Sequence, residues 1–172
     1  MPLLSNHPNR AECSPERIMS IIEAIMNRLN PDSQLRMSCI TASWDKNSQL
    51  LTICNAGHTF PVLFSGESSS DWELAALSQN QQPPLGVHAE KRSSVQYQPP
   101  ENATLLLYTD GLTEAVSPEG VQFSRIMYRK LKSLEPGGTP LLMLQTLVEI
   151  YRNHTGESVP SDDCCLLMVK MS

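Results

Sequence analysis

Acidic residues stand next to two apolar segments of the chain. Asp110 directly follows the apolar run 104–108, and the pair Asp162 and Asp163 directly precedes the apolar run 164–171. Continuous apolar runs of this length are typical of buried strands, and the end of a strand holds a side chain firmly enough for a functional role. We therefore treat the three aspartates as candidate site residues.

Their chemistry suits a divalent cation. Carboxylates that are brought close together repel one another unless a cation neutralises their charge. Oxygen-only ligands suit hard ions such as Mg²⁺ and Mn²⁺. However, an Asp-Gly pair after a strand is more often a simple turn, and an Asp-Asp pair before a strand is more often a solvated loop. The residue types alone favour the turn and the loop over a metal site.

The elements that must position these residues are a mixture of helices and strands. Ser14-Pro15-Glu16 has the composition of a helix start, with a capping serine, a proline and an acidic first turn. Apolar residues then recur at three- and four-residue spacing from Ile18 to Leu29, which predicts one apolar stripe that packs on another element. Strands are expected at 37–44, 49–54, 60–64, 95–97, 104–108 and 164–171, and further helices at 123–134 and 139–154. This order predicts an α+β fold with an antiparallel sheet covered by helices.

A second group of polar residues forms the expected turn Asn55-Ala56-Gly57-His58. His58 is a candidate proton donor, but a histidine in a turn between two strands more often packs or hydrogen-bonds within the hairpin. We favour that structural role. Gly57 and Gly86 are expected to allow backbone geometries that a β-carbon would obstruct.

The composition argues against several classes of function. The 172-residue chain carries a net charge of -5, so it lacks the clustered Lys and Arg with which proteins bind nucleic acid or an anionic membrane. Its apolar runs fall far short of the ~20 residues of a membrane-spanning helix, and its N-terminus has no signal-peptide pattern. We therefore expect a cytoplasmic protein with one domain over 14–172, after a loose lead-in over 1–13.

The cysteines give no sign of a zinc site or of a disulfide framework. Their number, five, is odd, and no two of them have C-x-x-C spacing. We expect buried, reduced thiols, since free cysteine behaves as a small hydrophobic residue. The five are Cys13, Cys39, Cys54, Cys164 and Cys165.

Four motifs follow one another in an order that resembles the C-terminal part of the SpoIIE-like, or RsbU-like, branch of PPM-type metal-dependent protein serine/threonine phosphatases. One such motif would be weak, whereas the ordered set is specific. The helix expected to end at Leu29 also resembles the family helix that precedes this region. The motifs are Asn55-Ala56-Gly57-His58, Pro84-Leu85-Gly86, the stretch from Leu106 to Ala115 around Thr109-Asp110-Gly111, and Asp162-Asp163.

The resemblance implies both a fold and a chemistry. The fold would be an antiparallel β-sandwich flanked by helices, and two Mn²⁺ or Mg²⁺ ions would activate a water that attacks phosphoserine or phosphothreonine. Asp110 and Asp162 would be metal ligands, and no side-chain nucleophile would be needed. Residues expected to support these ligands are Asp163, Gly111, Thr109, Thr113 and Glu114, and those expected to form a structural hairpin near the site are Asn55, Gly57 and His58.

One family motif is missing from the sequence. The family domain begins with strands that carry an aspartate, followed by Gly-Asp-x-x-Gly-His-Gly, whose aspartate bridges both ions, and the sequence contains no such motif. We therefore expect a partial domain that lacks its N-terminal strands. Metal binding would then be weak or absent, and an exposed sheet edge would favour dimerisation. Smaller departures from the residues usual in the family are Ser124, Glu101-Asn102 and Cys165.

The resemblance leaves two functions open. The leading expectation is a protein serine/threonine phosphatase that acts on a regulatory phosphoprotein, such as an anti-sigma-factor antagonist. In that case this chain is a truncated part of the enzyme and has little activity alone. The rival is a degenerate, non-catalytic phosphatase-like domain that binds a signalling partner. A generic α+β structural domain with chance motifs is the least favoured interpretation.

Overall fold

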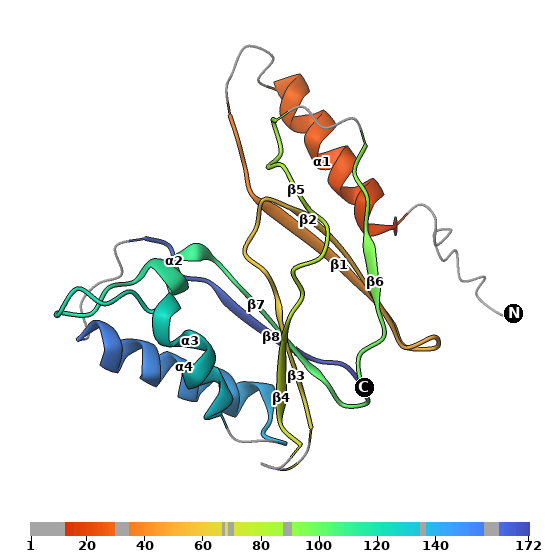
Figure 1. Cartoon of the computed structure of the whole chain (residues 1–172). Helices are drawn as coiled ribbons and strands as arrows, with labels where there is room; N and C mark the ends of the chain where they lie inside the picture. The colour runs from red at the N-terminus through yellow and green to blue at the C-terminus, as the bar shows by residue number, and fades with distance from the viewer. Residues whose placement is uncertain are drawn as a thin grey trace, which may run out of the picture. The chain divides into compact units, whose positions relative to one another are not determined.

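The computed structural model describes residues 13–29, 35–66, 68, 71–87, 91–134, 137–156 and 162–172. This part of the chain contains four helices and eight strands (Figure 1). Except for Cys13, the lead-in expected over 1–13 lies outside the described residues. Contacts divide the chain into two compact units, the first formed by Met1–His58 with Gln79–Gln98 and the second by Thr59–Ser78 with Pro99–Ser172.

The sheet of the first unit is built around strand β2 (Leu50–Ala56). Strand β1 (Cys39–Asp45) pairs with β2 along its whole length in antiparallel register and forms the hairpin that the sequence predicts. The other neighbours of β2 are β6 (Val95–Tyr97), which is antiparallel, and β5 (Gln81–Gln82), which is parallel. Strand β5 was not predicted, because two residues are too few to show a strand pattern.

Helix α1 (Pro15–Leu29) packs on β1 and β2 (Figure 1). It begins where the sequence predicts, and the Ile18 N–H donates to the Ser14 carbonyl at 3.0 Å. Met19 is fully buried in a small core with Cys54, Ala56 and Leu85. The helix packs on another element as predicted, but the sheet contacts only one side of it, so only part of the apolar stripe is covered. The apolar side chains that stay exposed are Ile18, Ile21, Ile25 and Leu29.

The sheet of the second unit has the strand order β4-β3-β7-β8, and every pair in it is antiparallel. Its strands are β3 (Val62–Ser65), β4 (Glu73–Ala76), β7 (Thr104–Tyr108) and β8 (Leu166–Lys170). Strand β7 is internal, and its neighbouring residues Leu105 and Leu106 are both buried although they point to opposite faces. Burial on both faces explains why the sequence of β7 is continuously apolar.

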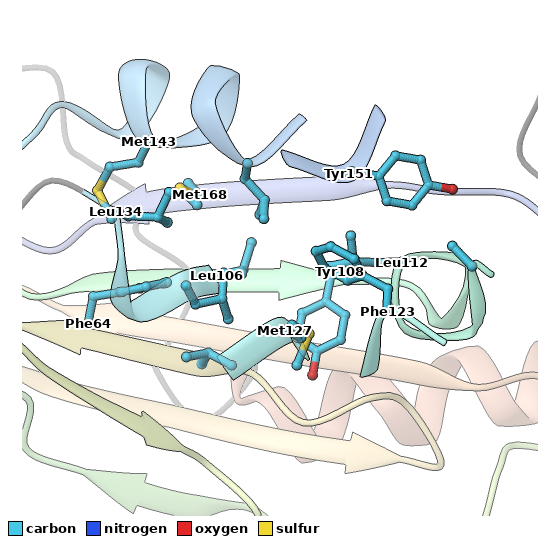
Figure 2. Close-up of a cluster of buried hydrophobic side chains, with 14 residues drawn as sticks. Phe64, Leu106, Tyr108, Leu112, Phe123, Met127, Leu134, Met143, Tyr151 and Met168 are labelled. Carbon is cyan, nitrogen blue, oxygen red and sulfur yellow. The ribbon is translucent and has the colours of Figure 1, made fainter. Parts of the chain in front are cut away.

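Helices α3 (Ser124–Lys132) and α4 (Pro140–Thr155) bury their apolar side chains against one face of this sheet. Both helices were predicted. Thr139 caps the N-terminus of α4, where its hydroxyl accepts a hydrogen bond from the Leu142 N–H at 3.3 Å, and Gly156, whose φ is 68°, caps the C-terminus. Figure 2 shows the shared core, with Phe64, Leu106, Tyr108, Leu112, Phe123, Met127, Leu134, Met143, Tyr151 and Met168 labelled.

The five cysteines are free thiols, but they are not all buried as predicted. Cys54 is buried, whereas Cys39 and Cys164 are partly buried. Cys13 and Cys165 are exposed, because each lies just outside a regular element, before α1 and before β8. Burial raises the pKa values of the Cys39, Cys54 and Cys164 thiols.

Candidate active site

The predicted acidic residues lie where β7 ends and β8 begins. Tyr108, the last residue of β7, pairs with Leu166, the first residue of β8. Asp110 follows the first of these strands, and Asp162 and Asp163 precede the second. Because the two strands are antiparallel neighbours, both acidic segments leave the sheet at the same end. Within the second unit, the structure therefore brings together the two segments that the sequence singled out.

Hydrogen bonds of Thr109 connect the segment after β7 to the segment before β8. The Thr109 N–H donates to the Cys165 carbonyl at 3.1 Å, and its hydroxyl accepts from the Cys165 N–H at 2.9 Å. The same hydroxyl donates to the Asp163 carbonyl at 2.8 Å. These three hydrogen bonds continue the pairing of β7 and β8 beyond the strands themselves. Thr109 thus has a defined structural role beside Asp110.

Gly111 allows the two segments to approach very closely. A β-carbon at Gly111 would lie 2.5 Å from the Asp163 carbonyl oxygen and 3.3 Å from that of Asp162. The first distance is shorter than any ordinary contact, and the atom in the way belongs to the backbone, which has little freedom to move. Glycine is therefore required here for the close approach rather than for an unusual φ.

The carboxylates themselves face solvent. Asp110, Asp162 and Asp163 are all exposed. One oxygen of Asp110 accepts from the Gly111 N–H at 3.1 Å, and one oxygen of Asp162 accepts from the Asp163 N–H at 2.7 Å. These hydrogen bonds limit the rotation of both side chains while leaving them accessible to a ligand.

Helix α2 (Asp110–Glu114) begins directly at Asp110. The Thr113 hydroxyl donates to the Asp110 carbonyl at 3.0 Å. Glu114 is exposed and lies one helical turn after Asp110, on the same side of the helix. The sequence predicted only a turn here, because five residues are too few to show helical periodicity.

These residues match a hard divalent cation in chemical type. Carboxylate oxygens are the ligands that Mg²⁺ and Mn²⁺ prefer. They are too few to enclose an ion: over the described residues, no group of three or more His, Cys, Asp or Glu side chains is placed to hold a metal. Asp110 and Asp162 would supply part of a coordination shell, and water or further carboxylates would have to complete it.

The Asn55 turn belongs to the first unit, and its geometry explains its sequence. Asn55 is buried, and its side chain bridges the turn by donating to the His58 carbonyl at 3.1 Å and accepting from the His58 N–H at 2.8 Å. Gly57 has a φ of 71°, and a β-carbon there would lie 2.5 Å from a ring carbon of Pro84. The roles assigned to Asn55, Gly57 and His58 near the acidic site stay predictions.

The Pro84-Leu85-Gly86 motif also has a structural explanation in the first unit. The buried Leu85 exchanges backbone hydrogen bonds with Met37 at 2.9 and 3.1 Å. Gly86 has a φ of 82°, and a β-carbon there would lie 2.1 Å from the Leu35 carbonyl oxygen. Together with Gly111, three of the four motifs therefore contain a glycine that the backbone requires.

An ion pair that the sequence did not reveal connects the loop around Pro84 to α1. Arg92 is 3% exposed and donates two hydrogen bonds to Glu23, at 2.6 and 3.0 Å. It also donates to the Pro83 carbonyl at 2.6 Å and to the Pro84 carbonyl at 3.3 Å. The available signal was Glu23 itself, a charged residue between apolar positions of an amphipathic helix.

A family model matches almost the entire chain. The model of Stage II sporulation protein E (SpoIIE) covers residues 4–172. The chain belongs to the SpoIIE family. The family resemblance predicted from the sequence is therefore confirmed.

Solved structures of SpoIIE-type and other PP2C phosphatase domains have the same fold. The SiaA PP2C domain of Pseudomonas aeruginosa is 19% identical, with a TM-score of 0.76 over 92% of this chain. The phosphatase domain of SpoIIE from Bacillus subtilis is 16% identical, with a TM-score of 0.61 over 94% of this chain. The catalytic domain of the serine/threonine phosphatase PstP, solved with two manganese ions, is 15% identical, with a TM-score of 0.55 over 87% of this chain and 65% of its own. The α+β fold with antiparallel sheets and flanking helices is confirmed.

The chain spans only part of these solved domains, 61% of the SiaA chain and 69% of the SpoIIE chain. No curated protein matches it. Among the residues that the structure describes, no helix combines the length and apolar character needed to cross a membrane. The cytoplasmic location expected from the sequence stays a prediction.

Proposed function

We propose that this chain is part of a metal-dependent protein phosphatase domain that removes phosphate from serine or threonine residues of a regulatory protein. The observation that carries the proposal is the close approach of Gly111 to the backbone of Asp162 and Asp163. It brings three exposed carboxylates to one end of β7 and β8. Membership of the SpoIIE family and the PP2C-type fold support the reaction class.

The proposal assigns a role to each of the residues that lie where β7 ends and β8 begins. Asp110 and Asp162 hold Mn²⁺ or Mg²⁺, and the two manganese ions in the PstP structure support that choice of ion. Thr109 and Gly111 set the spacing between the two aspartates, and Asp163 and Glu114 add negative charge around them. A divalent ion supplies activation of a water and neutralisation of charge on the phosphoryl group.

The hydroxyl groups beside Asp110 support a reaction without a side-chain nucleophile. The Thr109 hydroxyl makes two hydrogen bonds to the segment before β8, and the Thr113 hydroxyl donates to a backbone carbonyl. Both threonines therefore serve the local structure. Attack by water on the phosphorus atom accounts for the chemistry without assigning them a second role.

The substrate in this proposal is a phosphoprotein, such as an anti-sigma-factor antagonist, in the cytoplasm. To test the activity, the N-terminal segment that carries the family's bridging aspartate would be joined to this chain from the SiaA PP2C domain. We expect this hybrid to hydrolyse a phosphoserine protein in the presence of Mn²⁺, and the chain alone to show almost no turnover.

The substitution Asp110→Asn keeps the shape of the side chain and removes its charge, so it should lower the activity of the hybrid on the order of 100-fold or more. Glu119→Gln, at an exposed acidic residue in the loop between α2 and α3, is the matched control and should leave activity unchanged. Full activity of the Asp110→Asn hybrid would show that our assignment of metal ligands is wrong.

A further inference from the structure

The second unit contains a cavity of about 300 Å³ at one end of its core. Its walls come from four parts of this unit: the turn between β3 and β4, the start of β7, the end of β8, and the loop before α4 with the first turn of that helix. A volume of this size lies at the lower limit of small-molecule binding sites. The described residues that line the cavity include Gly66, Trp72, Thr104, Gly138, Met143 and Lys170.

The cavity lies at the opposite end of β7 from the acidic residues. Thr104 is the first residue of β7, and Asp110 comes after its last residue, Tyr108. Because a strand rises about 3.3 Å per residue, the length of β7 separates the two places by on the order of 15 Å. Figure 2 shows Phe64 and Met143 at one end of the core and Tyr108 at the other. A small ligand in the cavity would therefore not contact Asp110.

The side chains that point from β7 and β8 toward the helices change from apolar to polar at the cavity. Leu106 and Met168 pair across the two strands, and both belong to the core. Thr104 and Lys170 form the pair two residues further along, on the same face of the sheet. Thr104 is 5% exposed, whereas Lys170 is exposed. This face therefore ends in a hydroxyl and an ammonium group instead of another apolar pair.

Trp72 adds a hydrogen-bond donor to the wall of the cavity. Its Nε1–H is buried and has no hydrogen-bond partner within the described part of the chain. Its ring stacks on Phe64 with 5.6 Å between the ring centroids, and Phe64 pairs with Thr104 across β3 and β7. Buried polar groups normally have a partner, so a polar atom of a ligand would satisfy this donor.

The groups around the cavity suit a negative charge. No ion pair within the described residues includes Lys170, and none of the described residues that line the cavity is acidic. The cavity also borders the N-terminal end of the 16-residue helix α4, where the peptide dipoles favour an anion. Met143 and the Trp72 ring provide apolar surface. Together these features favour a small molecule with an anionic group and a flat apolar part.

We propose that this cavity binds a small organic anion. The carboxylate or phosphate group of the ligand lies near Lys170 and Thr104, and its flat apolar part lies against Trp72 and Met143. The Thr104 hydroxyl and the Trp72 Nε1–H donate hydrogen bonds to it. This site is separate from the proposed metal ligands and does not rest on the proposed phosphatase function.

The test titrates the ¹⁵N-labelled full chain with benzoate, phenyl phosphate and benzylamine in the presence of EDTA. We expect the two anions to shift the indole signal of Trp72 and the amide signals of Thr104 and Lys170, with dissociation constants of roughly 0.1–5 mM. Benzylamine has a similar ring but the opposite charge, so it should bind at least about tenfold more weakly. Binding of either anion supports the proposal, and the tighter of the two identifies the preferred anionic group.

Variants of the wall distinguish this site from nonspecific binding. Lys170→Gln should weaken anion binding about fivefold or more, and Trp72→Phe, which keeps a ring and removes the N–H, about threefold or more. Lys132→Gln, at an exposed lysine of α3, should leave it unchanged. Trp44→Phe should do the same, because Trp44 also has a buried Nε1–H without a partner in the described chain but belongs to the first unit. Circular dichroism checks that all four variants are folded.

Anion binding should persist when the N-terminal segment of the SiaA PP2C domain is joined to the chain, because the walls of the cavity come from the second unit. Loss of binding in this hybrid would show that the added segment occupies the cavity, and would overturn the proposal. Absence of binding by both anions, equal binding of benzylamine, or unchanged binding by both Lys170→Gln and Trp72→Phe would also overturn it. None of these outcomes depends on phosphatase activity.

Discussion

Gly111 and Thr109 determine how closely the acidic residues approach one another. Thr109 forms three hydrogen bonds to the segment before β8, and Gly111 leaves the space that this segment occupies. Neither residue carries charge, yet together they set the position of Asp110 relative to Asp162 and Asp163. The spacing of the proposed ligands is therefore controlled by two uncharged residues.

The substitution Gly111→Ala tests this control. Replacing a helical glycine by alanine normally stabilises a protein by up to about 1 kcal/mol. Here the new β-carbon would meet the Asp163 carbonyl oxygen at 2.5 Å, so we expect a destabilisation of about 1–3 kcal/mol instead. Urea unfolding measures this difference. A stabilised Gly111→Ala protein would show that the two segments do not approach as described.

Thiol reactivity provides a second prediction. Cys13 and Cys165 are exposed, whereas Cys54 is buried and its pKa is raised by that burial. Because the thiolate is the reactive form, we expect a disulfide reagent at pH 8 to modify Cys13 and Cys165 quickly and Cys54 only after unfolding. Mass spectrometry of the modified peptides identifies the sites. Rapid modification of Cys54 in the folded protein would contradict the burial.

The sequence was sufficient to find the three aspartates but not the contacts that position them. Asp110 and the pair Asp162 and Asp163 stand out because apolar runs mark the adjoining strands. The hydrogen bonds of Thr109, and the ion pair of Arg92, join residues more than fifty positions apart. Such contacts depend on the tertiary fold, and a single sequence carries little sign of them.

Elements with long, regular patterns were predicted, and short ones were not. Helix α1, the β1–β2 hairpin, strand β7 and helices α3 and α4 all lie close to their expected ranges. Strand β5 and helix α2 contain two and five residues, too few to show a period. The pattern of α1 predicted an apolar stripe correctly, but it could not tell which part of that stripe the sheet covers.

Strand β8 carries a prediction about self-association. It is the last strand in the order β4-β3-β7-β8, and Leu167 and Val169 on it are 52% and 40% exposed. An edge of this kind favours pairing with another chain. We expect the isolated chain to dimerise or aggregate at high concentration in sedimentation experiments, and Leu167→Lys to suppress this, since an edge lysine resists burial.

Leu141→Lys is the control for that experiment, because Leu141 is 65% exposed on helix α4 and belongs to no strand. It should leave the association unchanged. If the unmodified chain is a stable monomer at every concentration, the predicted edge pairing is wrong.

The chain as a whole belongs to the SpoIIE family but spans only part of the solved domains that it resembles. The SpoIIE family model covers residues 4–172, whereas the chain spans 61% of the SiaA domain. Over the described residues, no group of three or more His, Cys, Asp or Glu side chains is placed to hold a metal, so the carboxylates at the end of β7 and β8 would be an incomplete set of ligands. An ion held by so few protein ligands dissociates readily, which leads us to expect weak binding by this chain alone.

Paramagnetic NMR with Mn²⁺ tests the central claim, that Asp110 and Asp162 form part of one metal site. Mn²⁺ added to the ¹⁵N-labelled chain should first broaden the amide signals of Gly111 and Asp163, with an apparent dissociation constant of about 1 mM or weaker. Asp110→Asn should reduce this broadening, and Glu119→Gln should not. Broadening that spares Gly111 and Asp163, or that Asp110→Asn leaves unchanged, would contradict the account.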